Sequence, residues 1–476
     1  MNSKNPLKEP VDDTTGPTPD DQVDAVRQPR GVEQHGVEPV PLEQRTVGWW
    51  DLFQILINVL LNPGLILIGG LSVVAGLSFW AAVFAQVFAI VITFVAYTIM
   101  GTVGVDYGLP GIVSTRAFLG ISLSRWILSA LRAVSSAFFF AFQTLAGALG
   151  IKAVLAQLCG VDLSLILVSV VFAVFQAIVA LFGYNSLKWL SKIAFPLKVV
   201  ILGYLLVVMA RHDAPGFSPG EVFSYQGKVG WEWPVIAVWV NTIAAGWFSQ
   251  VTDAADYCRY TRSRKHMWIG TMAAAVIGTA GAGFFGAYAA AATLGKESNP
   301  FEIIPKLGAG TWTLLMVLIV LVLDNWTINV LNLYTGGLSL ANLATRLGRF
   351  WSTLAIAVVG TLLAAMPAVV NDVNEAFGVI GSVFGPVAGV IVADYLVLKR
   401  GKIDVPALFD PQGPYRYVGG VNVLALVWIV IGLGIYLVLP DWTIPVAATA
   451  LLSAIGYAVT ARLMPMREIE EVKDAI

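Results

Sequence analysis

The sequence predicts an all-helical integral membrane protein with about twelve transmembrane helices. Of its 476 residues, 57% are hydrophobic and 12% are charged, whereas soluble domains average about a quarter charged residues. Long apolar stretches recur from Leu52 to Leu463, and each approaches the roughly 20 residues that cross a hydrocarbon core. Lys and Arg gather in alternate loops between these stretches, as they do on the cytoplasmic side of membrane proteins.

Length and hydropathy place the expected spans within a few residues. They lie near 52–77, 80–104, 124–150, 162–182, 188–210, 234–257, 267–294, 311–341, 350–370, 375–397, 419–439 and 442–463. The basic loops fall on one side of this arrangement, so we expect both termini to be cytoplasmic. The expected location is the plasma (inner) membrane, which the chain crosses many times.

The chain divides into three expected regions. Residues 1–44 are rich in Pro, Asp, Glu and Gln without a sustained apolar run, which predicts a disordered cytoplasmic tail. Residues 45–465 form the transmembrane transporter domain, and residues 466–476 form a short cytoplasmic tail. The start of the chain has no basic stretch followed by an apolar segment and a cleavage site, so we expect no signal peptide.

Composition and motifs exclude several classes of function. Two Cys far apart and three His outside the apolar stretches argue against a disulfide framework and a metal centre. No phosphate-cradling loop, zinc-protease pattern or Ser-His-Asp set occurs, so we expect neither an enzyme nor an ATP-driven pump, and no cofactor. A formal net charge of -1 gives no reason to expect nucleic acid. A transporter driven by an ion gradient remains, with the lipid bilayer, a small molecule and a coupling cation as partners and no obligate protein partner.

Two spans are interrupted near their middles. The first contains Asn62-Pro63-Gly64, and the sixth contains Gly246 and Trp247 after two alanines. Breaks at membrane depth are tolerated beside protein or a water-filled cavity. Matched breaks five helices apart indicate two repeats with a binding site between them. The alternative is that Gly and Pro are simply more frequent in membrane helices.

Aromatic and amide side chains accompany these breaks. Phe139 and Gln143 are four residues apart in span three and therefore share a helix face. In span six, Trp247 adds a second flat surface beside the bare backbone of Gly246, and Ser249 follows. Such groups could stack on and hydrogen-bond a flat heterocycle. The alternative is an aromatic packing stripe, with the Gln143 amide bonded to a neighbouring helix.

Span eight carries a polar seam. Asp324 lies among apolar residues, where a carboxyl must be paired, bound to a cation or partly protonated. A buried basic partner such as Lys198 or Arg132 would make its role structural. Asn329 and Asn332 follow at helical spacing, and they could line a pathway or hold helices together. At the end of span six, Asp253, Asp256 and Arg259 are expected to form a structural or gating ion-pair group.

Six short segments, in order, resemble the nucleobase:cation symporter-1 family, in its purine/cytosine permease branch. They are 38–46, 76–80, 114–120, 255–260, 332–339 and 393–400. The resemblance covers the membrane part of the chain. It implies a five-plus-five inverted-repeat, leucine-transporter-like core with two added C-terminal helices.

The resemblance further implies alternating-access import of a nucleobase or related ring, such as cytosine, a purine, allantoin or a hydantoin, coupled to a cation gradient. Because a fold does not set function, two alternatives stay open. One is transport of another small solute such as an amino acid, and the other is a membrane receptor that does not transport.

The resemblance also assigns residues to the bound ring. Two aromatic side chains sandwich it, amides of spans three and eight bond its edges, a glycine exposes backbone, and a span-one polar residue lies near the break. These positions fall on Phe139, Trp247, Gln143, Asn329, Asn332, Gly246 and Asn62.

Coupling is where the chain departs from the family pattern. Members that use sodium hold the ion between span-one carbonyls and two adjacent span-eight hydroxyls. Here Thr327 keeps one hydroxyl, but Ile328 replaces the second. Isoleucine offers no oxygen, and cations of this kind need several. We therefore expect proton coupling through Asp324, with sodium as the alternative coupling ion.

Overall fold

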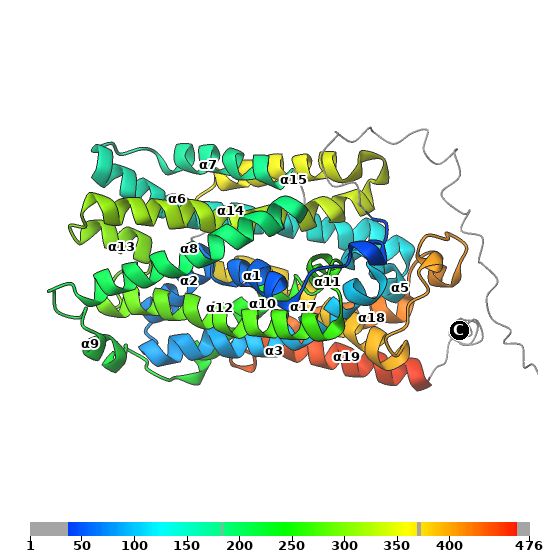
Figure 1. The fold of residues 1–476 in the computed structure, drawn as a ribbon. Helices are drawn as coiled ribbons and strands as arrows, with labels where there is room; N and C mark the ends of the chain where they lie inside the picture. Colours follow the sequence, from blue (N-terminus) through cyan, green and yellow to red (C-terminus); the bar gives the residue numbers. More distant parts are fainter. Residues whose placement is uncertain (1–36, 182–183, 369–372, 464–476) are drawn as a thin grey trace, which may run out of the picture.

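The computed structural model describes residues 37–181, 184–368 and 373–463, and for residues 184–189 it describes the backbone alone. Long helices lie side by side along one axis and form an elongated bundle (Figure 1). Those residues contain isolated β-bridges but no β-strand. The helices are α1 (Trp49–Leu60), α2 (Pro63–Val74), α3 (Phe79–Tyr107), α4 (Gly111–Ser114), α5 (Arg116–Leu119), α6 (Ser129–Cys159), α7 (Leu165–Ala180), α8 (Tyr184–Ala210), α9 (Pro219–Ser224), α10 (Trp233–Phe248), α11 (Asp253–Cys258), α12 (Arg264–Ala292), α13 (Pro300–Lys306), α14 (Thr311–Leu343), α15 (Gly348–Ala364), α17 (Val373–Ala393), α18 (Val423–Tyr436) and α19 (Pro445–Leu463).

The expected all-helical membrane architecture is confirmed. In the part of the chain that is described, eight helices are long and apolar enough to cross a membrane, and the bent pair α1–α2 makes a ninth candidate. The shorter apolar helices α7, α10 and α18 occupy three further expected span positions. The count of twelve crossings stays a prediction, because these three are each shorter than the roughly 20 residues of a full span.

The first span breaks because its sequence ends one helix and starts another. Helix α1 ends at Leu60, and α2 leaves it at an angle of 47°. Asn62 adopts an extended backbone and its side-chain Oδ1 accepts a hydrogen bond from Leu65 N at 2.9 Å, which caps α2. Pro63 occupies the first turn of α2, where its missing N–H costs nothing.

The sixth span breaks at the corresponding position. Helix α10 ends at Phe248, and a turn of four residues leads into the short helix α11. The Ser249 hydroxyl donates to Gly246 O at 2.6 Å, so it bonds the backbone of the preceding turn. The first break lies where the sequence predicts it, whereas the second comes slightly later, because Gly246 and Trp247 are still helical and the turn occupies residues 249–252.

The broken helices are packed inside the bundle. Helix α12 lies against α1, α2 and α3, while α14 packs on α6, α8 and α15. The approach of α12 to α2 requires glycine at Gly286, because a Cβ there would lie 1.9 Å from Ile66 O. Close helix contact through small residues is the usual solution in membranes.

The expected N-terminal tail is described only in part. Val40 is buried, and its backbone N donates to Gly108 O at 3.0 Å, next to the end of α3. Arg45 donates through Nη2 to Val40 O at 2.7 Å and through Nη1 to Asp106 O at 3.0 Å. Residues 1–36 and the expected C-terminal tail 466–476 lie outside the described part, so the three-region division stays a prediction.

Candidate functional site

A small cavity of about 40 Å³ lies where the two broken spans face α6, α14 and α17, so a ring-sized molecule fits only when these helices move apart. Its walls are mostly aromatic and aliphatic, with a few amide side chains, which is the usual composition of a site for a small organic molecule. The lining residues are Val59, Asn62, Leu65, Ile68, Phe139, Phe142, Gln143, Ile243, Gly246, Trp247, Gln250, Ile328, Asn332 and Phe377.

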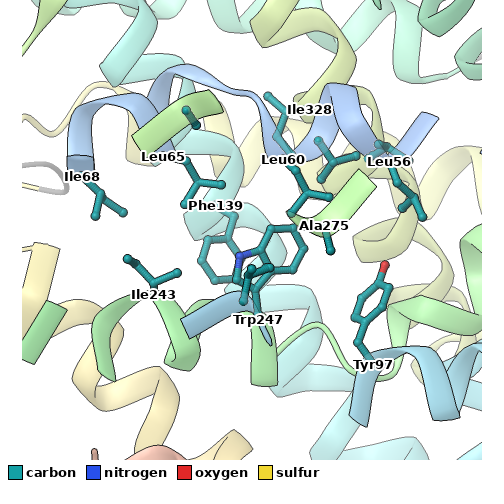
Figure 2. Close-up of a cluster of buried hydrophobic side chains, with 14 of the residues drawn as sticks. Leu56, Leu60, Leu65, Ile68, Tyr97, Phe139, Ile243, Trp247, Ala275 and Ile328 are labelled. Atoms are coloured by element: carbon teal, nitrogen blue, oxygen red, sulfur yellow. The ribbon is translucent and has the colours of Figure 1, made fainter. Parts of the chain in front are cut away.

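Two flat rings enter this cavity from different helices. Figure 2 shows Phe139 of α6 and Trp247 of α10 at the centre of a cluster of buried hydrophobic side chains, and both line the cavity together with Leu65 and Ile243. The Trp247 ring is held edge-on by Phe94, with ring centroids 5.0 Å apart. The Phe139 ring meets Phe377 at 5.5 Å, again edge-on. Both rings are therefore fixed in place before any ligand arrives.

The amide of Gln143 is half used by the protein. Its Oε1 accepts a hydrogen bond from Gly64 N, at the start of α2, at 3.0 Å. Since a backbone N–H can only donate, this bond fixes which end of the amide is the oxygen. Nε2 has no hydrogen-bond partner among the described residues and belongs to a side chain that lines the cavity. Gln143 thus bonds a neighbouring helix and still offers donors to a ligand.

The glycines at the site make room for its side chains. A Cβ on Gly64 would lie 2.7 Å from both terminal atoms of Gln143. A Cβ on Gly246 would lie 2.8 Å from the ring of Phe377. The absence of a side chain at Gly64 and Gly246 is therefore what lets Gln143 and Phe377 approach so closely.

The remaining candidate residues divide between the cavity and its supports. Asn62 and Asn332 line the cavity. Asn329 does not, because it is fully buried and its Nδ2 bonds Thr144 Oγ1 at 3.0 Å and Gln176 Oε1 at 2.5 Å. Its Oδ1 accepts from Asn332 Nδ2 at 3.0 Å, so Asn329 orients Asn332. Ser249 is also buried outside the lining.

Two residues that line the cavity, Phe377 and Gln250, are not among those selected from the sequence. Phe377 lies on α17, far along the chain from both breaks, and only the packing of α17 on α10 brings it to the cavity. Gln250 lies just beyond Ser249 in the turn after α10. A polar residue in an interrupted span was the signal that could have identified it.

Asp324 forms a buried ion pair with Lys198 of α8. Both side chains are at most 1% exposed. Lys198 Nζ also donates to Leu61 O at 2.8 Å and to Asn58 O at 3.2 Å. Thr327 Oγ1 donates to Asp324 O at 2.8 Å, within its own helix. Of the two basic partners considered for Asp324, Lys198 is the one that it meets, so the pairing that a structural role requires is present.

Arg132 instead pairs with Asp253 at the start of α11. Its Nε donates to Asp253 Oδ1 at 3.0 Å, and both side chains are buried. Asp256 Oδ1 accepts from Gly111 N at 2.7 Å, and Arg259 Nη2 donates to the Tyr334 hydroxyl at 2.5 Å. The group therefore ties α11 to α6, α4 and α14.

Comparison with known proteins places this geometry in a family. Residues 39–460 match the family described as permeases for cytosine/purines, uracil, thiamine and allantoin. The hydantoin permease of Microbacterium maritypicum is 25% identical, over 85% of this chain and 84% of its own. The allantoin permease of Bacillus subtilis (strain 168) is 26% identical, over 83% and 84% respectively.

The fold agrees with this assignment. Mhp1, a nucleobase-cation-symport-1 family transporter solved in a closed conformation with bromovinylhydantoin bound, superposes with a TM-score of 0.78. The match covers 93% of this chain and 100% of Mhp1 at 22% identity, which establishes a shared leucine-transporter-like fold. With a family match over nearly the whole membrane part and a cavity at two broken helices, the chain belongs to the family of permeases for cytosine, purines, uracil, thiamine and allantoin.

Proposed function

We propose that this protein imports a nucleobase-like heterocycle, of the cytosine, purine, allantoin or hydantoin type, across the plasma (inner) membrane. The observation that carries the proposal is the combination of two fixed rings and an available amide in one buried cavity. A planar ring with polar edges is the ligand that such walls suit, since stacking satisfies its faces and hydrogen bonds satisfy its edges.

Each lining group has a distinct role in this proposal. Phe139 and Trp247 stack on the two faces of the ring. The free Nε2 of Gln143 donates to a ring carbonyl or nitrogen, and Asn332, held by Asn329, contacts another edge. Gly246 and Asn62 complete the cavity wall, with the Gly246 carbonyl accepting from the Ser249 hydroxyl and the Asn62 amide bonded to Val59 O and Leu65 N.

The position of the cavity supports the proposal of alternating access. The cavity lies between the bent pair α1–α2 and the helices α6, α14 and α17, so a change in the bend alters its walls. The ion pairs of Arg132 with Asp253 and of Lys198 with Asp324 lie outside the lining and connect helices that must rearrange. In the proposed transport cycle, these two ion pairs rearrange while the substrate ring stays bound in the cavity.

We propose protons as the coupling ions. Ile328 lines the cavity without offering an oxygen, so at these two positions α14 has one hydroxyl, that of Thr327, in place of two. Asp324 Oδ2 is buried without a hydrogen-bond partner among the described residues, so a proton can bind there without displacing an existing contact. Sodium is the other candidate ion, and the uptake conditions below distinguish the two.

Uptake by whole cells tests the function. Cells that lack their own permeases would express the protein and receive labelled cytosine, adenine, allantoin or uracil. We expect concentrative uptake of at least one ring, increased at lower external pH, abolished by a protonophore and unchanged when choline replaces sodium. Uptake of an amino acid but of no ring would refute the substrate class. Saturable binding without accumulation would indicate a receptor.

A further inference from the structure

The ammonium group of Lys198 is held as a bound metal cation would be held. It has three hydrogens to donate, and the structure gives it three acceptors: Asn58 O, Leu61 O and Asp324 Oδ1. The first is a main-chain carbonyl in the last turn of α1, the second is the main-chain carbonyl of the residue that follows α1, and the third belongs to a carboxylate of α14. The side chain is 1% exposed, so bulk solvent does not reach the ammonium group.

The break in the first span is what makes the two carbonyls available. A helix leaves the carbonyls of its last turn without intrahelical donors, and they carry the negative end of the helix dipole. Helix α1 ends at Leu60, so Asn58 and Leu61 lie in this terminal region. Carbonyls of an unwound segment together with a carboxylate form an oxygen set that suits a small hard cation.

We infer that the Lys198 ammonium is a built-in cation at this site, so that the contact between α1 and α14 forms without a sodium ion. The inference deepens the proposed function, on which its relevance to coupling rests. It differs from the role given to Asp324 alone, because Lys198 itself fills the space between the two helices.

The surroundings of Lys198 contain no competing charge. Besides α14, helix α8 packs against α1, α7 and α12. The acidic residue of α1, Asp51, pairs at 3.1 Å with Lys192, which lies nearer the start of α8. Helix α7 has no acidic or basic residue, and α12 has such residues only in its first turn. Asp324 is therefore the single charged partner that the described residues give Lys198.

The site is connected to the ligand cavity through both helices. Leu61, whose carbonyl binds the ammonium, directly precedes Asn62 of the cavity wall. Ile328 of the cavity wall follows Asp324 by one helical turn. Whatever cation joins α1 to α14 therefore also sets the spacing of two cavity walls.

Removing the ammonium should open a site for sodium. In Lys198→Ala the two carbonyls and the Asp324 carboxylate remain, but the carboxylate loses its buried counter-charge. Such a carboxylate is costly until a cation neutralises it. We therefore expect saturating sodium to raise the midpoint temperature of unfolding of this variant by several degrees. The wild type should have the same midpoint temperature in sodium chloride and in choline chloride.

Thermal unfolding of the purified full-length protein in detergent measures this effect without any substrate. Sodium chloride is titrated against choline chloride at constant ionic strength and mildly alkaline pH, where protons compete less for the carboxylate. Lys192→Ala serves as the matched control, because it removes another lysine of α8 that is paired with an aspartate. It should stay indifferent to sodium.

Two results would overturn the inference. A saturable, sodium-specific stabilisation of the wild type would mean that sodium binds despite Lys198. A folded Lys198→Ala protein with equal midpoints in sodium and choline would mean that the oxygens do not form a cation site. If Lys198→Ala cannot be purified, Lys198→Ser is used in its place, and the wild-type titration already decides the first point. Since no substrate is present, these results are independent of the uptake panel.

Discussion

Trp247 offers a direct test of the ring site. Its side chain is 6% exposed, lines the cavity and is held by Phe94 at 5.0 Å, so its face is already positioned for a ligand. Stacking of a base on an aromatic side chain contributes about 1–3 kcal/mol by alanine substitution. Since about 1.4 kcal/mol corresponds to a tenfold change in affinity, Trp247→Ala should weaken binding roughly 5- to 150-fold. Trp247→Phe keeps a flat ring and should lose much less.

Stability has to be separated from affinity in this experiment. Removing a buried Trp costs about 3–5 kcal/mol of folding free energy wherever it lies in a core. Trp239 is the matched control, because it is 5% exposed on the same helix and does not line the cavity. Trp239→Ala should lower the unfolding midpoint without changing affinity.

The assay is equilibrium binding of the ring identified in the uptake panel, by titration calorimetry on purified protein. Each variant is first checked for delivery to the membrane and for its unfolding midpoint. A folded Trp247→Ala protein with wild-type affinity would refute the stacking site. Equal losses in Trp247→Ala and Trp239→Ala would also refute it, since a general loss of packing would then explain both.

Further predictions concern the opposite ring, the amide and the ion pair. Phe139→Ala should weaken binding by about 1–3 kcal/mol through loss of the second stacking face, and an unchanged binding isotherm would place the ring elsewhere. Gln143→Ala should reduce affinity and also lower the unfolding midpoint, because it leaves the Gly64 N–H unpaired at a cost of about 1–3 kcal/mol; normal values of both would contradict the geometry. Gly64→Ala should impair binding by displacing Gln143, which its Cβ would approach to 2.7 Å, and calorimetry on the purified variant would detect this. Asp324→Asn should retain exchange of substrate across vesicles while losing proton-driven accumulation, since the amide still accepts from Lys198 but cannot take up a proton. If the rates of exchange and of accumulation instead fall together, in proportion to the amount of folded protein, the ion pair is purely structural.

The sequence predicts the helices and their breaks because those features are local. Pro63 and Asn62 determine where α2 begins, whatever surrounds them. The apolar lengths reflect the bilayer thickness, which is the same for every span. These are constraints that a single chain segment carries by itself.

The site could be predicted less completely, because its contacts join distant segments. Asn329 and Asn332 have similar neighbours in sequence, and it is the bonds to Thr144 on α6 and Gln176 on α7 that make the first a packing residue. Lys198 is identifiable as a partner of Asp324, but the carbonyls that complete its coordination depend on the bend at Leu61. Phe377 reaches the cavity only through packing of α17, so nothing near it in the sequence indicates a ligand.

The hydrogen bond from Gly64 to Gln143 constrains how the protein can vary. The two residues are 79 positions apart in the sequence. The side-chain oxygen of Gln143 accepts the hydrogen bond from Gly64 N, and a Cβ on residue 64 would lie 2.7 Å from the Gln143 amide. A shorter residue 143 therefore removes one of two obstacles to a larger residue 64, because the ring of Phe142 also lies 2.7 Å from the position of its Cβ. Libraries aimed at new substrates should randomise both positions together, because single changes at either one start from a strained or unpaired intermediate.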